Sequence, residues 1–491
     1  MKADVNSINP SGLTGAAVTG SIWSYANFAL GKLTIFVTTI ILARILQPED
    51  FGLIAMALIV VNFLKRIQNL GVGDALIYYR DKSGTFSYTA FIISTAAGLF
   101  FSLLVCFSAP GIAAFYHEPK SIPVLQVLSV WLIIISLGAI HEASLRKAMD
   151  FRKRFVPQIA QAVAKGGCSI TLALIGLGIW SLVWGQLAGE AAATILLWVV
   201  FRWRPKLQFS VDAAKALIKY GSQTILMKFL QGIFKNADFL IIGRRMDAVQ
   251  LGFYTIAFRL PDILIDGIQS AVTPVIFSAY VRVQDDIEAL RRGFLKTLKF
   301  VFLFSMPVSL GMYIIAPEFV EIFYTNRWAP VIPVIRALSF YAIINTFDSQ
   351  ANLIYRATDR IALGNKIGLI KMVGAVPVLW IAAGYNILAV AVAQIGLALI
   401  IVAVQIVVVS RILGIRYTDL LRDLQPGITA STVMLSGIWL INIWISPLPA
   451  ILRMLVIITL GGTLYTGTVR VMYPDIFIQF AEILLKRKKV S

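Results

Sequence analysis

Charged residues, cysteines and histidines are all scarce in this sequence of 491 residues. Only 14% of the residues are Asp, Glu, Lys or Arg, whereas a soluble domain carries about 25%, so an ordinary soluble globular protein is excluded. The two cysteines, Cys106 and Cys168, and the two histidines, His117 and His141, are too few and too scattered for a disulfide framework or a zinc site. We therefore expect no metal and no cofactor.

Motifs of catalysis and of nucleotide binding are missing as well. The sequence has no phosphate-binding glycine loop and no nucleophile elbow, and no connection is long enough for an ATP-hydrolysing domain. Lys2 is not followed by a short apolar core and a cleavage site, so we expect no removable signal peptide. The sequence thus predicts a protein that is not an enzyme and whose uphill transport would depend on an ion gradient.

Long apolar runs are abundant, since 58% of the residues are hydrophobic. A backbone in lipid must satisfy its own hydrogen bonds, so each run of about 20 apolar residues is interpreted as a transmembrane helix. The predicted fold class is an all-α polytopic membrane protein with fourteen spans. These spans are 15–44, 51–76, 86–109, 122–144, 156–176, 180–201, 216–243, 249–278, 297–317, 331–354, 364–383, 386–410, 426–446 and 450–469.

Lysine and arginine are distributed unevenly over the connections between these spans. One alternate set of connections, together with both termini, holds most of them. The other set holds only Arg44, Lys120, Arg244, Arg245, Arg327 and Arg453. By the positive-inside rule both termini are cytoplasmic. The net charge of +19 is therefore mainly an orientation signal, and we expect no nucleic acid as a partner.

An internal repeat relates residues that are 200 positions apart. Arg44 falls on Arg244 and Gly52 falls on Gly252, within longer matching segments. Six spans precede the second copy, so both copies have the same orientation and are related by an axis along the membrane normal. The predicted division is an N-terminal lobe of spans 1 to 6 (1–205), a C-terminal lobe of spans 7 to 12 (206–410), and two extra helices with a basic tail (411–491).

Polar stripes recur on the first, second, seventh and eighth spans. On the eighth span, Arg259, Asp262, Asp266 and Gln269 are spaced so that they share one helical face. A charged side chain at a helix centre costs about 2.5–3.5 kcal/mol on insertion, so a lipid-facing helix would not carry such a stripe. We therefore expect these four spans to surround a hydrated cavity.

Cations outnumber acids on these faces, which predicts a positive cavity suited to a pyrophosphate group. The candidate substrate-binding residues are Lys32, Lys65, Arg66, Lys228, Lys235 and Arg259. The candidate coupling or cavity acids are Glu190, Asp238, Asp262 and Asp266, and the candidate external gate is Arg44 with Arg244. The alternative interpretation is structural, with ion pairs such as Arg259 with Asp262 and with lysines that reach an interface.

Three other sets of polar residues also allow two interpretations. Asp348 is either a carrier of protons or ions or the partner of a neighbouring cation, and Lys371 is a candidate cavity cation together with Lys165. Glu49 and Asp50 suit either a catalytic external loop or the first turn of the second span. We favour the helix end for this acidic pair because acids stabilise helix N-termini.

Three motifs carry a resemblance to a known family. They are Leu42-Ala-Arg44-Ile-Leu with Phe51-Gly52-Leu, Val283-Gln-Asp-Asp286 with Glu288, Leu290 and Arg291, and Arg327-Trp328 with Val331-Ile-Pro-Val334. In these motifs, and collinearly over nearly the whole chain, the sequence resembles the Wzx-type lipid-linked oligosaccharide flippases. That family belongs to the multidrug/oligosaccharidyl-lipid/polysaccharide (MOP) exporter superfamily, and the resemblance is greatest to its colanic-acid exporter branch.

The resemblance implies two pseudo-symmetric lobes around a central cationic cavity. It implies a flippase that moves undecaprenyl-pyrophosphate-linked repeat units across the bacterial inner membrane by alternating access, for exopolysaccharide or O-antigen synthesis. The expected partners are this lipid-linked substrate, the membrane and other polysaccharide assembly proteins, and we expect a monomer. Two alternatives remain, namely a multidrug exporter of the same superfamily with an acidic cavity, and a membrane glycosyltransferase or polymerase with a catalytic external loop.

Overall fold

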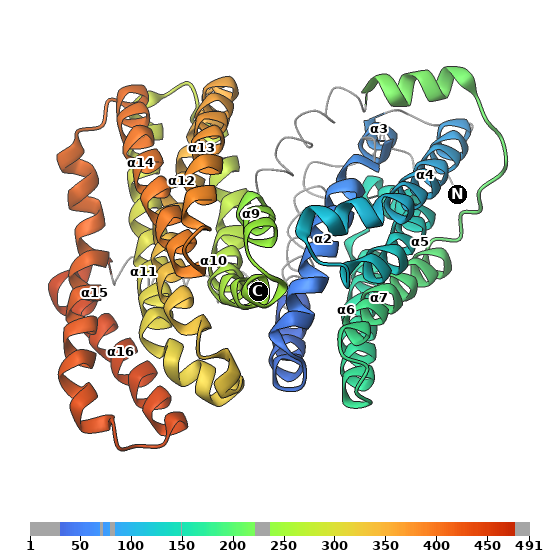
Figure 1. The fold of residues 1–491 in the computed structure, drawn as a ribbon. Helices are drawn as coiled ribbons and strands as arrows, with labels where there is room; N and C mark the ends of the chain where they lie inside the picture. The colour runs from blue at the N-terminus through green and yellow to red at the C-terminus, as the bar shows by residue number, and fades with distance from the viewer. Residues whose placement is uncertain (1–29, 69–71, 79–83, 149, 221–235, 477–491) are drawn as a thin grey trace. The chain divides into compact units, whose positions relative to one another are not determined.

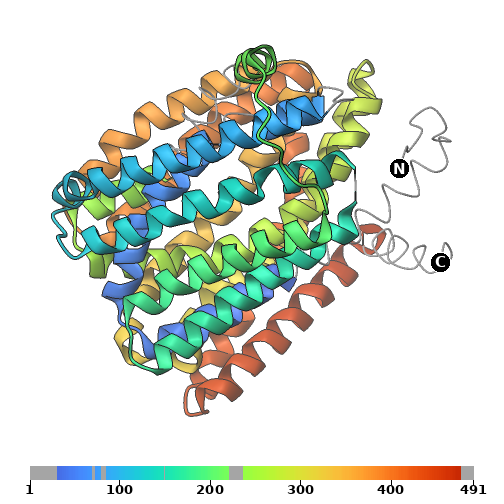
Figure 2. The same ribbon diagram turned by 90° about the vertical axis from the view of Figure 1, so that its right-hand side faces the viewer.

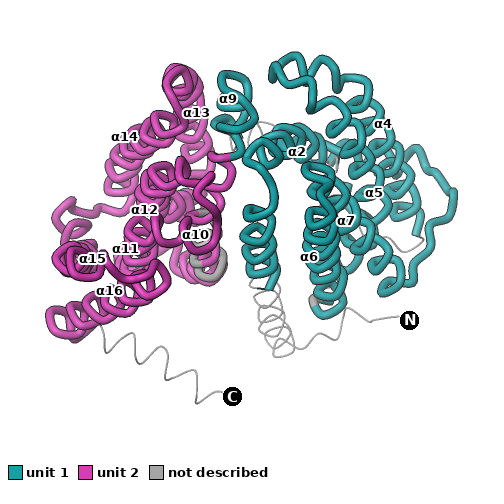
Figure 3. The backbone as a smooth tube through the Cα atoms, turned by 60° about the horizontal axis from the view of Figure 1, so that its bottom comes forward, with its two compact units in different colours: residues 1–252 teal, residues 253–491 magenta. Residues whose placement is uncertain are grey.

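The computed structural model describes residues 30–68, 72–78, 84–148, 150–220 and 236–476 (Figure 1). Throughout these residues the regular secondary structure is helical, as the apolar runs predict. The chain divides into two compact units, Met1–Gly252 and Phe253–Ser491, which are coloured separately in Figure 3. The predicted lobe boundaries come from the repeat rather than from compactness, and they stay a prediction.

The first unit is a bundle of long helices around an apolar core. Its helices are a segment over residues 30–45, α2 (Pro48–Gln68), α3 (Val72–Tyr78), α4 (Thr85–Tyr116), α5 (Ser121–Lys147), α6 (Phe151–Leu174), α7 (Ile179–Val200), a segment over 211–220, α9 (Ala237–Arg245) and the start of α10 (Ala248–Arg282). Helices α4 and α5 form one close pair and α6 and α7 another, and the long helices run nearly parallel to one another (Figure 2). Val61, Leu128, Leu132 and Val183 are fully buried between α2, α5 and α7.

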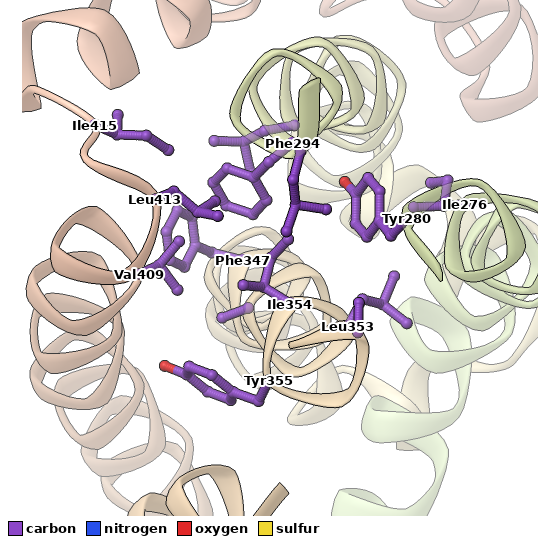
Figure 4. Packing of buried hydrophobic residues seen from close by; sticks show 14 of the residues in the cluster. Ile276, Tyr280, Phe294, Phe347, Leu353, Ile354, Tyr355, Val409, Leu413 and Ile415 are labelled. Atoms are coloured by element: carbon purple, nitrogen blue, oxygen red, sulfur yellow. The ribbon is translucent and has the colours of Figure 1, made fainter. Parts of the chain in front are cut away.

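The second unit continues α10 and adds six long helices. They are α11 (Ile287–Phe323), α12 (Val331–Ala357), α13 (Ile361–Ala382), α14 (Ile387–Leu413), α15 (Tyr417–Ile445) and α16 (Ala450–Met472), with the short turn η2 (Asn326–Trp328) before α12. Figure 4 shows Phe294, Phe347, Ile354 and Val409 packed together in its main core. These side chains join α11, α12 and α14 into one bundle.

The predicted spans agree with the observed helices in order and place. Nine helices in the described ranges are long and apolar enough to cross a membrane by length and composition. The first and seventh predicted spans, 15–44 and 216–243, lie partly outside the described residues. Each of the other predicted spans overlaps one long described helix, so the all-α polytopic class is confirmed.

Several predicted boundaries are wrong. The thirteenth span, for example, is predicted to begin at 426, but α15 begins at Tyr417. The second and ninth spans show the reason. The sequence predicts the second span at 51–76, but α2 ends at Gln68 and the separate helix α3 begins at Val72. The sequence predicts the ninth span at 297–317, but α11 runs from Ile287 to Phe323. The first turns of α11 are amphipathic rather than apolar. They are held by the capping carboxylate of Asp286, which accepts from the Ala289 amide at 2.9 Å, and by ion pairs to α15.

Candidate functional site

A carboxylate in the membrane-spanning part of the first unit is held by donors from two neighbouring helices. Glu190 lies on α7, and its Oε2 accepts from Trp131 Nε1 of α5 at 2.9 Å and from Gln161 Nε2 of α6 at 2.7 Å. Lys65 of α2 lies over the indole, with Nζ 4.7 Å from the ring centroid of Trp131. We call Lys65, Trp131, Gln161 and Glu190 the Glu190 cluster.

The close packing of α6 on α7 brings the carboxylate within reach of Gln161. A Cβ placed on Gly189 would lie 2.8 Å from the carbonyl oxygen of Gln161, so only glycine allows the two backbones to approach this closely. The indole then separates two of the predicted residues, because Lys65 contacts its face and Glu190 its N–H edge. A cation and an acid are thus placed around one rigid ring without forming a direct ion pair.

Sequence reasoning missed Trp131 and Gln161. A signal for Gln161 was present, because Gln158, Gln161 and Lys165 follow one another at spacings of three and four within the fifth predicted span. No comparable pattern marks Trp131, since tryptophan in an apolar run is ordinary and its N–H partner comes from another helix. Only the packing of α5 against α7 shows that Trp131 belongs to the site.

The remaining predicted cations of the first, second and seventh spans have different surroundings. Lys32 is half-buried in the helix over 30–45, and Arg66 is exposed in the last turn of α2. Lys228 and Lys235 lie outside the described residues. Of the predicted cations, the structure therefore brings Lys65 together with a predicted acid, and it does not test the two lysines of the seventh span.

The predicted residues of the eighth span lie on α10, as expected. Arg259 is half-buried, and its positive charge acts on the phenol of Tyr324 just after α11, where burial raises the pKa of Tyr324 and Arg259 opposes this rise. The backbone at Asp262 and Asp266 is part of α10, but their side chains are not among those that the structure describes. Asp238 is buried in the first turn of α9.

Two glycines that the repeat relates form a reciprocal helix crossing inside the first unit. A Cβ on Gly52 would lie 1.7 Å from the carbonyl oxygen of Ala248, the first residue of α10. A Cβ on Gly252 would lie 1.9 Å from the carbonyl oxygen of Pro48, the first residue of α2. Any side chain at either glycine would force the helix ends apart. We call these four residues the glycine crossing.

Arg244, one of the two predicted gate residues, is held against the end of α4. Its guanidinium contacts both ring nitrogens of His117, with Nη1 2.9 Å from Nε2, and lies 5.4 Å from the ring centroid of Phe115. His117 ends α4 in the left-handed conformation, with φ at 55°. Arg44 is exposed near the end of the helix over 30–45.

Glu49 and Asp50 lie in the first turn of α2, which confirms the favoured interpretation of this pair. Glu49 pairs with Lys120 at 2.6 Å, and this contact raises the pKa of Lys120. Asp50 accepts from the Gln47 amide at 2.9 Å and also from the amide of Ile179 at the start of α7. Burial raises the pKa of Asp50, although these amides oppose the rise. Both acids therefore join helix ends.

The second unit holds a half-buried carboxylate on the helices that the repeat relates to α5, α6 and α7. Asp348 of α12 pairs with Lys371 of α13 at 2.7 Å and accepts from Gln405 of α14 at 2.5 Å and from Asn352 at 2.9 Å. Asp348 is therefore the partner of a cation. Among the described residues the donors to Glu190 are neutral, so the two carboxylates differ in how they are held.

Solved structures with a similar fold are membrane transporters. The lipid II flippase MurJ aligns with a TM-score of 0.75 over 94% of this chain and 100% of its own, at 16% identity. An inward-facing multidrug transporter of the MATE family in the MOP superfamily aligns with a TM-score of 0.61 over 79% of this chain and 95% of its own, at 15% identity. The chain thus has the all-helical fold of these membrane transporters.

The chain belongs to the family of polysaccharide biosynthesis proteins, whose model matches residues 41–333. It is 22% identical over 333 residues to the lipopolysaccharide biosynthesis protein WzxC of Escherichia coli K12, covering 67% of this chain and 68% of WzxC. It is 27% identical over 305 residues to the succinoglycan biosynthesis transport protein ExoT of Rhizobium meliloti, covering 62% of each chain. The predicted resemblance to polysaccharide exporters is confirmed, and the protein is a transporter rather than an enzyme.

Proposed function

We propose that the protein moves undecaprenyl-pyrophosphate-linked oligosaccharide repeat units from the cytoplasmic to the periplasmic leaflet of the bacterial inner membrane. Relatives named for polysaccharide biosynthesis and transport support this substrate class. The fold of a lipid II flippase supports movement of a lipid-linked head group. The uneven distribution of lysine and arginine supports cytoplasmic termini. We also propose that the protein works as a monomer.

The glycine crossing is the observation that carries the alternating-access mechanism. It joins the starts of α2 and α10, which are equivalent positions of the two repeats, at the end of the spans that the charge distribution makes periplasmic. Outward release of a head group requires this contact to open, and inward loading requires it to close. Arg44 and Arg244, near this end, form the external gate.

The proposed head-group site uses the cations of the first, second, seventh and eighth spans. Lys32, Lys65, Arg66, Lys228, Lys235 and Arg259 offset the charge of the pyrophosphate, while the lipid tail stays in the bilayer. Glu190, Asp238, Asp262 and Asp266 are the candidates for coupling to protons or sodium. Glu190 is the first to test, because protonation of a carboxylate held by an indole and an amide breaks no ion pair.

The leaflet that holds the lipid-linked units in cells lacking the protein tests the proposal. Extracted units and their accessibility to an enzyme added from the periplasmic side are compared with cells that carry the protein. We expect complete units to accumulate on the cytoplasmic leaflet. Unpolymerised units on the periplasmic side would favour a polymerase, and unchanged lipid-linked intermediates would favour a drug exporter. Other polysaccharide assembly proteins are proposed partners, to be sought by crosslinking in the same cells.

A further inference from the structure

The segment that follows α7 exposes large apolar side chains between basic ones. We call residues 202–220 the connector. Leu207 is 93% exposed, and Val211, Phe209 and Ile218 are 58%, 55% and 49% exposed. The connector carries the cations Arg202, Arg204, Lys206, Lys215 and Lys219 but only one acid, Asp212. Such a combination is typical of segments that lie in the interface of an anionic membrane.

The other side of the connector is packed onto the first unit, so its exposed side has a defined direction. Ala213, Ala214 and Leu217 are buried, and Leu217 belongs to a core cluster with residues of α3, α4 and α5. The Ser210 amide donates to Thr89 Oγ1 at 3.1 Å, and the Trp203 carbonyl lies 3.2 Å from His141 Nε2. These contacts hold the chain in place on both sides of the exposed stretch.

The helical segment over 211–220 separates its two faces by helical spacing. Val211, Lys215 and Ile218 follow spacings of four and three and are exposed, whereas Ala213, Ala214 and Leu217 lie on the opposite, buried side. Apolar side chains therefore alternate with a lysine on the outward face. A lysine placed in this way can reach a head group while the neighbouring apolar side chains enter the acyl region.

The connector lies at the end of the first unit opposite the glycine crossing. Helix α7 begins at Ile179, whose amide is held by Asp50 of α2, and it ends at Val200 directly before the connector. A helix of 22 residues is about 33 Å long, which matches the hydrocarbon thickness of a bilayer. The connector is therefore at the level of a membrane surface, which the charge distribution makes the cytoplasmic one.

We propose that the connector is a membrane-surface anchor that binds the head groups of anionic phospholipids. Arg202, Lys206 and Lys215 contact the phosphates, and Leu207, Phe209 and Ile218 insert below them. Arg204 instead serves the fold, because its Nη1 donates to the carbonyls of Trp198 and Trp203 at 3.0 and 3.1 Å. The anchor fixes the first unit at the leaflet surface, where lipid-linked head groups are presented, but it does not depend on which substrate is moved.

Fluorescence of the reconstituted full-length protein tests the anchor. A polarity-sensitive fluorophore is attached at Leu207→Cys in a Cys106→Ser and Cys168→Ser background, and vesicles contain phosphatidylcholine alone or with phosphatidylglycerol. We expect blue-shifted emission and quenching by lipids spin-labelled near the head group, at least twofold stronger in the anionic vesicles. A fluorophore at Asp285→Cys, an exposed position in a polar connection, is the control for a water-exposed site.

Charge removal separates head-group binding from simple proximity to the bilayer. Arg202→Gln, Lys206→Gln and Lys215→Gln together are expected to lower the quenching in anionic vesicles at least twofold. Arg292→Gln, Lys296→Gln and Arg422→Gln remove the same charge from exposed positions elsewhere and are expected to leave it unchanged.

Three results would overturn the anchor. They are water-like emission in both vesicles, equal quenching with and without phosphatidylglycerol, and energy transfer between two labelled copies, which would indicate a second chain on this surface. The vesicles contain no lipid-linked oligosaccharide, so the outcome is independent of whether the protein is a flippase. Thermal unfolding of each variant in detergent shows whether the fold is retained.

Discussion

At the scale of single residues, the carboxylates Glu190 and Asp348 differ in whether their partners are neutral or charged. Glu190 is held by an indole N–H and an amide, and Lys65 contacts the same indole without pairing with the acid. Asp348 pairs directly with Lys371. Protonation of Asp348 would break an ion pair, whereas protonation of Glu190 would break none of the contacts with charged groups that the structure describes.

Glu190→Gln tests the coupling role at this scale. The amide oxygen can still accept from Trp131 and Gln161, so we expect the fold and the unfolding temperature to be retained while export of lipid-linked units falls at least tenfold. Export is measured by complementation of cells that lack the protein. Wild-type export by this variant would remove Glu190 from the coupling mechanism.

Trp131→Phe tests the positioning of the carboxylate. The change keeps an aromatic ring under Lys65 but removes one donor to Glu190, and a hydrogen bond to a charged group contributes about 1.5–3 kcal/mol. We expect a lower unfolding temperature in detergent. Trp180→Phe, at a half-buried position near the start of α7, is the matched control. Equal shifts for both variants would contradict a specific role for Trp131.

The burial of Asp50 predicts that the free energy of unfolding depends on pH. Burial raises the pKa of Asp50, so the folded chain binds the proton more tightly than the unfolded chain. This contribution opposes folding at neutral pH and is relieved as the pH falls through the folded-state pKa. We expect wild type to gain stability relative to Asp50→Asn between pH 7 and pH 4, measured by thermal unfolding. The opposite sign would show that the amide contacts with Gln47 and Ile179 outweigh burial.

At the scale of helices, the repeat-related positions Gly52 and Gly252 make backbone contacts rather than ion pairs. Gly52 faces the carbonyl of Ala248 and Gly252 faces the carbonyl of Pro48, so each helix end supplies both a glycine and a carbonyl. The sequence repeat identifies the two glycines as equivalent but says nothing of their meeting. Their reciprocity explains why both positions carry glycine.

Gly52→Ala and Gly252→Ala should each prevent the crossing from closing. The added methyl overlaps a backbone carbonyl, and such overpacking costs about 1–3 kcal/mol in the closed state. We expect export to fall. In a background without the native cysteines, we also expect a thiol introduced by Ala55→Cys to become reactive toward a membrane-impermeant reagent. Gly111→Ala is the control, since a Cβ there meets nothing within 4 Å. An unreactive thiol in both glycine variants would contradict the gate.

At the scale of the whole molecule, the cations fall into three groups. Cations in connections are expected to orient the chain in the membrane, and those within spans are candidates for binding the substrate. Cations that pair across helices join elements instead, as Arg291 does with Asp419 at 2.9 Å between α11 and α15. Only the cations within the spans are expected to determine transport.

Removal of the span cations together tests this division. Alanine at Lys32, Lys65, Arg66, Lys228, Lys235 and Arg259 is expected to abolish export while the protein still inserts and folds, because alanine is a strong helix former. The matched control replaces exposed cations at helix ends and in connections, namely Arg282, Arg292, Lys296, Arg360, Arg416 and Arg422. Export is measured by complementation, and wild-type export by the first variant would refute the cationic site.

The sequence by itself determined the helical class, the order of the spans, the repeat and the family. Hydropathy and periodicity are local properties of the chain, and an apolar segment in lipid forms a helix because its backbone must satisfy its own hydrogen bonds. It did not determine where α2 ends or that α11 extends to Ile287, since those boundaries depend on partners in other helices. It also did not show that Trp131 and Gln161 hold Glu190, or that Gly52 meets Ala248. Tertiary structure decided these contacts because they join residues far apart in the chain, where only the packing of one helix on another sets the distance.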